Sequence, residues 1–173
     1  KTAGKILTWN QKPINTVYHA TNGGVMASVD EAWSTKQVPY LEMRLDGPKH
    51  WSRKVHLPLS NEQYLKSFLF SESEAFGSDH PLFRWNRTLE SSQISKQLNH
   101  AKKVTGTFYP KKIYAVTRGN SGRVTSLKIK GNSGSEILLK LDDIRRVLRE
   151  LPSTLFVVKE IKEGKWLFSG GGF

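Results

Sequence analysis

The sequence predicts an α+β fold, mainly antiparallel sheet with hairpins and about three short helices. Strand-like and helix-like stretches alternate irregularly along the 173 residues, which argues against a doubly wound fold. Short turn signals, such as Gly-Asn-Ser-Gly at 119–122, separate neighbouring strand-like runs and are typical of hairpins. No internal repeat or low-complexity segment interrupts this pattern.

The N-terminal segment predicts a hairpin that leads into a glycine-containing break. Two strand-like runs, 5–9 and 14–20, flank a turn at 10–13 that starts with Asn and ends with Pro. The Asn-Gly-Gly stretch at 22–24 follows, and residues of these types tolerate a positive φ. We therefore expect the second strand to end at this point.

Two helix starts are marked by capping patterns. Ser28 is expected to cap a short helical turn, with Glu31 as its capping-box partner three residues later. A longer helix is expected to start at Ser60, with Gln63 at the equivalent position. Between them, residues 41–46 alternate apolar and polar side chains, which predicts a half-buried strand.

The rest of the chain predicts more strands than helices. The polar segment 72–80 is a predicted loop, which is either a domain boundary or a surface insertion within one domain. Helices are predicted over 91–103 and 141–151, where apolar residues gather on one face. Strands are predicted over 82–90, 111–119, 123–131, 135–141, 154–161 and 165–170.

Composition narrows the class of protein and of partner. The net charge of +12 predicts an anionic partner or setting, such as nucleic acid or the acidic polymers of a cell wall. The absence of cysteine excludes disulfides, thiol catalysis and cysteine-ligated metals. No apolar run approaches the ~20 residues of a membrane span. The sequence starts and stops abruptly, so we expect it to be part of a longer protein.

Few residues indicate chemistry by their spacing alone. The glycine stretches lack the Lys-Ser/Thr of a phosphate-binding loop, and no His-Glu-x-x-His pattern occurs, so neither a nucleotide nor a metal site is expected. His19 is interpreted as a hydrogen-bonded residue at a strand end rather than a ligand contact. Trp33 is a candidate for stacking on a sugar or a base, and Tyr40 is a weaker one. The Arg-Gly-Asn-Ser-Gly-Arg stretch at 118–123 could bind an anion, although a solvated hairpin turn is the simpler interpretation.

General acid–base catalysis needs an acid within reach of its proton partner. Glu31, Glu42 and Glu62 are single acids in strand or helix contexts, with no second carboxylate paired to them by spacing. The residues themselves therefore nominate no catalytic acid.

A set of short motifs, in a fixed order over nearly the whole chain, resembles the stage II sporulation protein D (SpoIID/LytB) domain family. The matching stretches are YHATNGG (18–24), SVDEAW (28–33), VPYL (38–41), FRWNRTLE (83–90), RGNSGRVTSLKIKG (118–131), LDDIRRVLRELPSTLF (141–156) and FSGGGF (168–173). The resemblance implies one domain over 1–173 that lacks the family's N-terminal segment and its last motif.

The resemblance implies a bacterial cell-wall lytic transglycosylase, which cleaves peptidoglycan glycan strands stripped of stem peptides in sporulation or cell-wall remodelling. A single acid would protonate the glycosidic oxygen and help the sugar's own 6-hydroxyl to close an anhydro ring. The family's catalytic Glu precedes the matched region, so the catalytic residue is unknown here and the enzymatic role stays open. The alternative is a non-catalytic peptidoglycan-binding module that enhances an N-acetylmuramoyl-L-alanine amidase.

The resemblance also implies a site, a partner and a place. The stretch Tyr18, His19, Thr21, Asn22, Gly23 and Gly24 would line a glycan groove, Trp33 and Tyr40 would stack on sugar faces, and Ser121 and Arg123 are secondary candidates. Some members bind zinc through a His and cysteines, but this chain has no cysteine, so no cofactor is expected. The expected location is extracytoplasmic, in the cell wall or periplasm, with a membrane anchor outside these residues as one option. A nucleic-acid partner is not expected, because only the net charge favours it.

Overall fold

The computed structural model describes residues 3–33 and 36–173 and confirms the predicted α+β class. Every strand pairing among these residues is antiparallel. The longest helix has 10 residues, and no described helix is long and apolar enough to cross a membrane. In chain order the elements are β1 (Thr8–Trp9), β2 (Lys12–Pro13), β3 (Val25–Met26), α1 (Val29–Ala32), β4 (Arg44–Leu45), α2 (Lys49–Ser52), α3 (Glu62–Phe70), β5 (Trp85–Glu90), α4 (Ser91–His100), β6 (Pro110–Arg118), β7 (Val124–Gly131), the 3-10 turn η1 (Asn132–Gly134), β8 (Glu136–Lys140), α5 (Asp142–Val147), β9 (Phe156–Lys162) and β10 (Lys165–Gly170).

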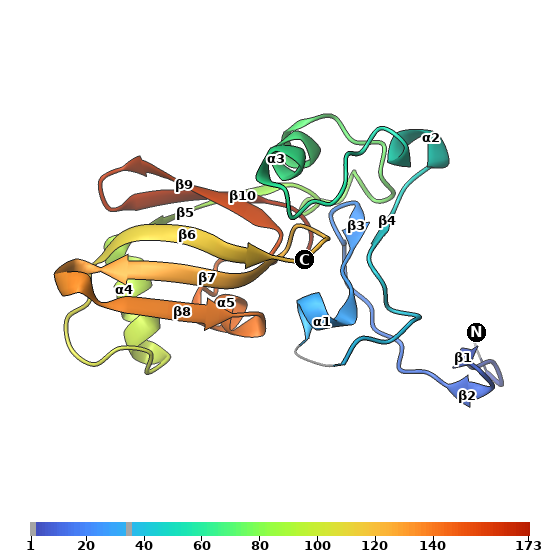
Figure 1. Ribbon diagram of the computed structural model, residues 1–173, viewed down its shortest axis with the longest axis horizontal. Helices are drawn as coiled ribbons and strands as arrows, with labels where there is room; N and C mark the ends of the chain where they lie inside the picture. Colours follow the sequence, from blue (N-terminus) through green and yellow to red (C-terminus); the bar gives the residue numbers. More distant parts are fainter. Residues whose placement is uncertain (1–2, 34–35) are drawn as a thin grey trace.

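Two three-stranded sheets form the larger part of the molecule, in the orders β6-β7-β8 and β5-β10-β9 (Figure 1). Strand β6 also lies against β9, and α4 packs on β5 and β6, so the sheets and helices enclose one core. Alternate residues of each strand point inward, and these inward residues are apolar. Its largest fully buried side chains are Trp166, Phe156, Phe168, Leu89, Ile94, Leu98, Leu127, Ile129, Leu139 and Ile144.

A second, smaller core lies beneath α3. The side-chain oxygen of Asn61 accepts hydrogen bonds from the N–H groups of Gln63 and Tyr64 and so caps this helix. The cap therefore sits one residue later than the predicted Ser60. The buried face of α3 packs against β3 and the α2 region, and the members of this core are Val25, Trp51, Leu59, Leu65, Phe68, Leu69, Ala75, Phe83 and Leu155. The predicted loop at 72–80 thus contributes a buried alanine to this core.

The predicted N-terminal strands are mostly wrong. The hairpin is tighter than expected, because Asn10 and Gln11 take the two turn positions with φ of 48° and 63°. The second strand is Lys12–Pro13, inside the predicted turn, and pairs with Thr8–Trp9. Residues 14–20 form no strand, because no neighbouring strand pairs with them. The strand predicted over 41–46 is reduced to Arg44–Leu45.

Two further helix details differ from the sequence expectation. Ser28 is the residue before α1, as predicted, but its side chain makes no capping hydrogen bond. Glu31 forms no capping box, because its carboxylate points to a distant partner, Ser121. The single-turn helix α2 (Lys49–Ser52) was not predicted at all. The three longer helices, α3, α4 and α5, correspond to the predicted ones.

Candidate functional site

The glycine stretch at 22–24 forms a tight turn that is stabilised by hydrogen bonds from neighbouring side chains. Asn22 Oδ1 accepts a 2.8 Å hydrogen bond from Gly24 N–H, and Asn22 Nδ2 donates to Asp46 Oδ2 over 2.6 Å. Thr21 Oγ1 accepts from Gly23 N–H at 3.3 Å. The side chains of Thr21 and Asn22 are both buried. These hydrogen bonds hold the turn in one conformation.

This turn packs backbone to backbone on the glycines at the C-terminal end of the chain. A Cβ added to Gly23 would lie 2.8 Å from Gly171 C and Gly172 N, so only glycine allows the approach. Phe173 N–H donates to Thr21 O at 2.7 Å and extends the contact. Segments far apart in the sequence therefore meet here, and the C-terminus lies beside β3 (Figure 1).

Arg123 holds the turn through hydrogen bonds to its backbone. Its guanidinium donates to Val25 O at 3.1 Å and to Asn22 O at 3.3 Å. Burial lowers the pKa of Arg123 to about 10, while Glu31 acts in the opposite direction. Arg123 is therefore still charged at neutral pH and places a positive field beneath the turn.

Glu31 ties α1 to the turn between β6 and β7. Its carboxylate is buried and accepts hydrogen bonds from the backbone N–H of Ser121, at 3.2 Å, and from the Ser121 hydroxyl. A Cβ on Gly119 would come within 2.1 Å of Glu31 Cδ, so a larger residue at that position would displace the Glu31 carboxylate. The bond holds the helix that precedes Trp33 against the turn that leads to Arg123.

These contacts enclose a cleft of about 560 Å³. Tyr18 and Trp33 are the exposed aromatic residues at its edge, with 95% and 47% of their surface exposed. The polar groups come from the turn and from the α5 region. The residues that line the cleft are Val17, Tyr18, His19, Ala20, Thr21, Asn22, Met26, Ala27, Ala32, Trp33, Leu41, Arg123, Asp142, Arg145, Ser153, Thr154 and Phe173.

Six of the ten residues named from the sequence therefore line one cleft: Tyr18, His19, Thr21, Asn22, Trp33 and Arg123. The other four lie elsewhere. Gly23 and Gly24 form the turn behind the surface, and Ser121 is fully buried against Glu31. Tyr40 packs on the ring of Trp9, with centroids 6.1 Å apart, and does not line the cleft.

Sequence reasoning missed the contribution of α5 to the cleft. Arg145 is exposed, its guanidinium lies 5.5 Å from the ring centroid of Phe173, and both line the cleft. Asp142 also lines it, but its carboxylate is engaged by Arg146 Nε at 2.7 Å. The helix was predicted from its apolar face, and that pattern does not show which neighbour its polar face meets.

His19 lies in this cleft with a pKa shifted downward. Burial is the main cause, and the positive charge of Arg123 adds to it, while Asp46 opposes it. His19 is therefore neutral at pH 7, and its ring can both donate and accept a hydrogen bond. In the described part of the chain, no group of three His, Asp or Glu side chains is placed to hold a metal ion.

A family model for a domain of unknown function, DUF8618, matches residues 27–173. The chain belongs to the DUF8618 family. The match includes Trp33, Arg123 and Arg145, whereas the turn at 21–24 precedes the matched region of this DUF8618 domain. No match to the chain is found among curated proteins.

The buried bond of Glu31 predicts a stability effect. Glu31→Ala leaves the Ser121 hydroxyl and N–H buried without their acceptor, which should cost about 1–3 kcal/mol of unfolding free energy. Asp30→Ala, at the neighbouring exposed acid, is the matched control and should change the value by no more than about 0.5 kcal/mol. Urea unfolding of both variants measures the difference, and equal midpoints would show that the buried bond contributes nothing.

The pKa of His19 predicts a pH dependence of stability. Because the folded state lowers this pKa below 6.5, the unfolded chain binds the proton more readily. The contribution of neutral His19 to the free energy of unfolding is therefore fully present above about pH 6.5. It is lost as the pH falls below that value. His19→Gln should flatten the decline in unfolding free energy between about pH 7 and pH 5. A decline as steep as that of the wild type would contradict the assignment.

Proposed function

We propose that this domain binds the glycan strands of bacterial peptidoglycan as part of a lytic transglycosylase that acts in sporulation or cell-wall remodelling. The observation that carries the proposal is the cleft, in which the exposed rings of Tyr18 and Trp33 stand beside a rigid polar turn. The ordered resemblance to the SpoIID/LytB domains supports it independently. The expected setting is extracytoplasmic, in the cell wall or periplasm.

The chemistry of the cleft suits a sugar chain. The C–H face of a pyranose ring packs on an aromatic ring, while its hydroxyl groups pair with fixed polar side chains. Tyr18 and Trp33 supply the aromatic surfaces, and neutral His19 supplies a group that both donates and accepts. The turn is held by internal hydrogen bonds, so little conformational entropy is lost when a ligand binds.

The charge of the cleft favours a sugar with a carboxylate. Arg145 has no carboxylate within 4.0 Å among residues 3–33 and 36–173, and it points its charge at the cleft beside Phe173. When an amidase removes the stem peptide from peptidoglycan, the lactyl group of muramic acid becomes a free carboxylate. A guanidinium binds a carboxylate through two parallel hydrogen bonds. We therefore assign Arg145 the recognition of stripped strands.

A second role is enhancement of an N-acetylmuramoyl-L-alanine amidase. It is favoured because the described lining of the cleft offers no unpaired carboxylate as a proton donor. Asp142 is the one carboxylate that lines it in the described residues, and Arg146 engages this group. Cleavage would need a proton donor at the glycosidic oxygen. The intact protein incubated with stripped glycan separates the roles, because a transglycosylase leaves anhydro-muramyl ends that mass spectrometry detects. Faster amidase turnover without such ends supports the enhancer.

Removal of an aromatic wall should weaken glycan binding. We expect Trp33→Ala to lower the affinity for purified stripped glycan about tenfold, which corresponds to about 1.4 kcal/mol. Trp9→Ala is the control, because Trp9 is similarly exposed but packs on Tyr40 outside the cleft. Sedimentation with insoluble glycan measures both. Equal retention of the two variants would place glycan binding outside this cleft.

Arg145 and Arg149 form a matched pair for testing the role of charge. Arg145→Gln should weaken binding of stripped glycan roughly tenfold and leave binding of peptide-bearing glycan nearly unchanged. Arg149→Gln should change neither, because Arg149 is an exposed arginine that does not line the cleft. A similar loss in both variants would mean that only the net charge matters, and the assignment of Arg145 would fail.

A further inference from the structure

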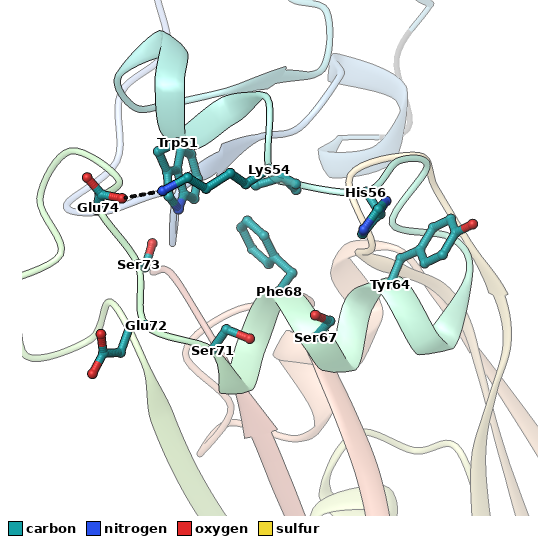
Figure 2. Close-up of a pocket in the computed structure, with 11 residues that line it drawn as sticks. Trp51, Lys54, His56, Tyr64, Ser67, Phe68, Ser71, Glu72, Ser73 and Glu74 are labelled. Atoms are coloured by element: carbon teal, nitrogen blue, oxygen red, sulfur yellow. Dashed lines mark hydrogen bonds and ion pairs between the residues drawn. The ribbon is translucent and has the colours of Figure 1, made fainter.

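A second hollow, of about 350 Å³, lies between α2, α3 and the segment 71–74. Figure 2 shows its walls: α3 runs along one side and carries Phe68, which faces Trp51 from the α2 side. None of its lining residues lines the cleft described above. Its size is within the range of small-molecule sites, about 300–1,000 Å³.

The inner surface of this hollow is aromatic and firmly held. Trp51 and Phe68 are 5% and 7% exposed, and their ring centroids lie 6.1 Å apart. A Cβ on Gly47 would come within 2.4 Å of Trp51 Cε3, so the glycine allows the ring to settle at this depth. The half-buried ring of Tyr64 adds a side wall together with His56, at a centroid distance of 5.4 Å.

The rim of the hollow is rich in hydrogen-bond acceptors. Three serine hydroxyls line it, from Ser67, Ser71 and Ser73, and Glu72 and Glu74 add two carboxylates. Glu74 is already engaged, by His50 Nε2 at 2.6 Å and by Lys54 Nζ at 3.5 Å.

Glu72 is the acceptor that remains for a ligand. It has no cation within 4.0 Å among the residues described, so its carboxylate has no internal ion pair to give up. Together with Glu74 it also makes the rim differ in charge from the rest of the chain. The lining contains two carboxylates and one lysine, whereas the whole chain carries a net charge of +12. An anionic ligand would meet repulsion at this rim, whereas hydroxyl donors would meet acceptors.

We propose that this hollow is a binding site for a neutral saccharide of one or two rings. The C–H face of the sugar would lie toward Tyr64 and the aromatic floor, and its hydroxyls would donate to Glu72 and the serines. The combination of a fixed aromatic floor with the Glu72 carboxylate and the Ser67 and Ser71 hydroxyls at the rim carries the proposal, since Ser73 Oγ already accepts from Ala75 N–H. It stands apart from glycan binding in the cleft, because the two sites have no lining residue in common.

The test is a titration with N,N′-diacetylchitobiose, a neutral N-acetylglucosamine dimer, followed by the amide resonances of the domain up to about 10 mM sugar. We expect the amides of 54–56 and 67–74 to shift in a saturable manner. Tyr64→Ala and Glu72→Gln should each weaken this binding at least threefold, and Glu72→Gln changes only an exposed side chain, so the fold stays intact.

Variants outside the hollow serve as controls. Tyr109→Ala and Glu163→Gln alter an exposed tyrosine and an acid outside the hollow and should bind as the wild type does. Trp33→Ala should also leave these shifts unchanged, which separates this site from the cleft. The proposal is overturned if no saturable shift occurs, if the shifts occur only around the cleft, or if Tyr64→Ala and Glu72→Gln bind normally. Preferential binding of tetramethylammonium would overturn it as well, because the hollow would then be a cation site.

Discussion

The buried guanidinium of Arg123 is the contact on which the site depends. It joins the start of β7 to the backbone of the turn at Asn22 and to β3 at Val25, so the N-terminal segment is held on the sheet of β6, β7 and β8. Its charge is costly to bury, and burial lowers its pKa to about 10. The same charge helps to keep His19 neutral. One residue thus holds the backbone of the cleft and adds to the effect of burial on the pKa of its histidine.

The two hollows lie on either side of a shared scaffold. Gly24 belongs to the turn beside the cleft, and a Cβ on it would lie 3.4 Å from Trp51 Cη2, at the floor of the second hollow. The turn is therefore packed from behind by the aromatic side chains that form the other site. Such close packing leaves few alternative arrangements, so each surface is preformed rather than shaped by its ligand.

Local patterns in the sequence predicted the fold well where neighbours in the chain decide the structure. The hairpins β6–β7 and β9–β10 and helices α3 to α5 follow from periodicity and turn residues. Residues 14–20 have a strand-like pattern but find no partner strand, and that depends on tertiary packing. Glu31 matches a capping box by spacing, yet Ser121, 90 residues away, offers it buried donors. Arg145 was missed for the same reason, because only the fold brings α5 beside the turn.

Under the proposed function, a peptidoglycan strand binds in the cleft between Trp33, the turn at 21–24 and α5. A structure of the domain bound to a peptide-stripped glycan tetrasaccharide tests it most directly. We expect a sugar ring against Trp33, hydroxyl contacts with Asn22 or His19, and a lactyl carboxylate beside Arg145. A tetrasaccharide bound elsewhere on the domain, with the cleft unoccupied, would contradict it.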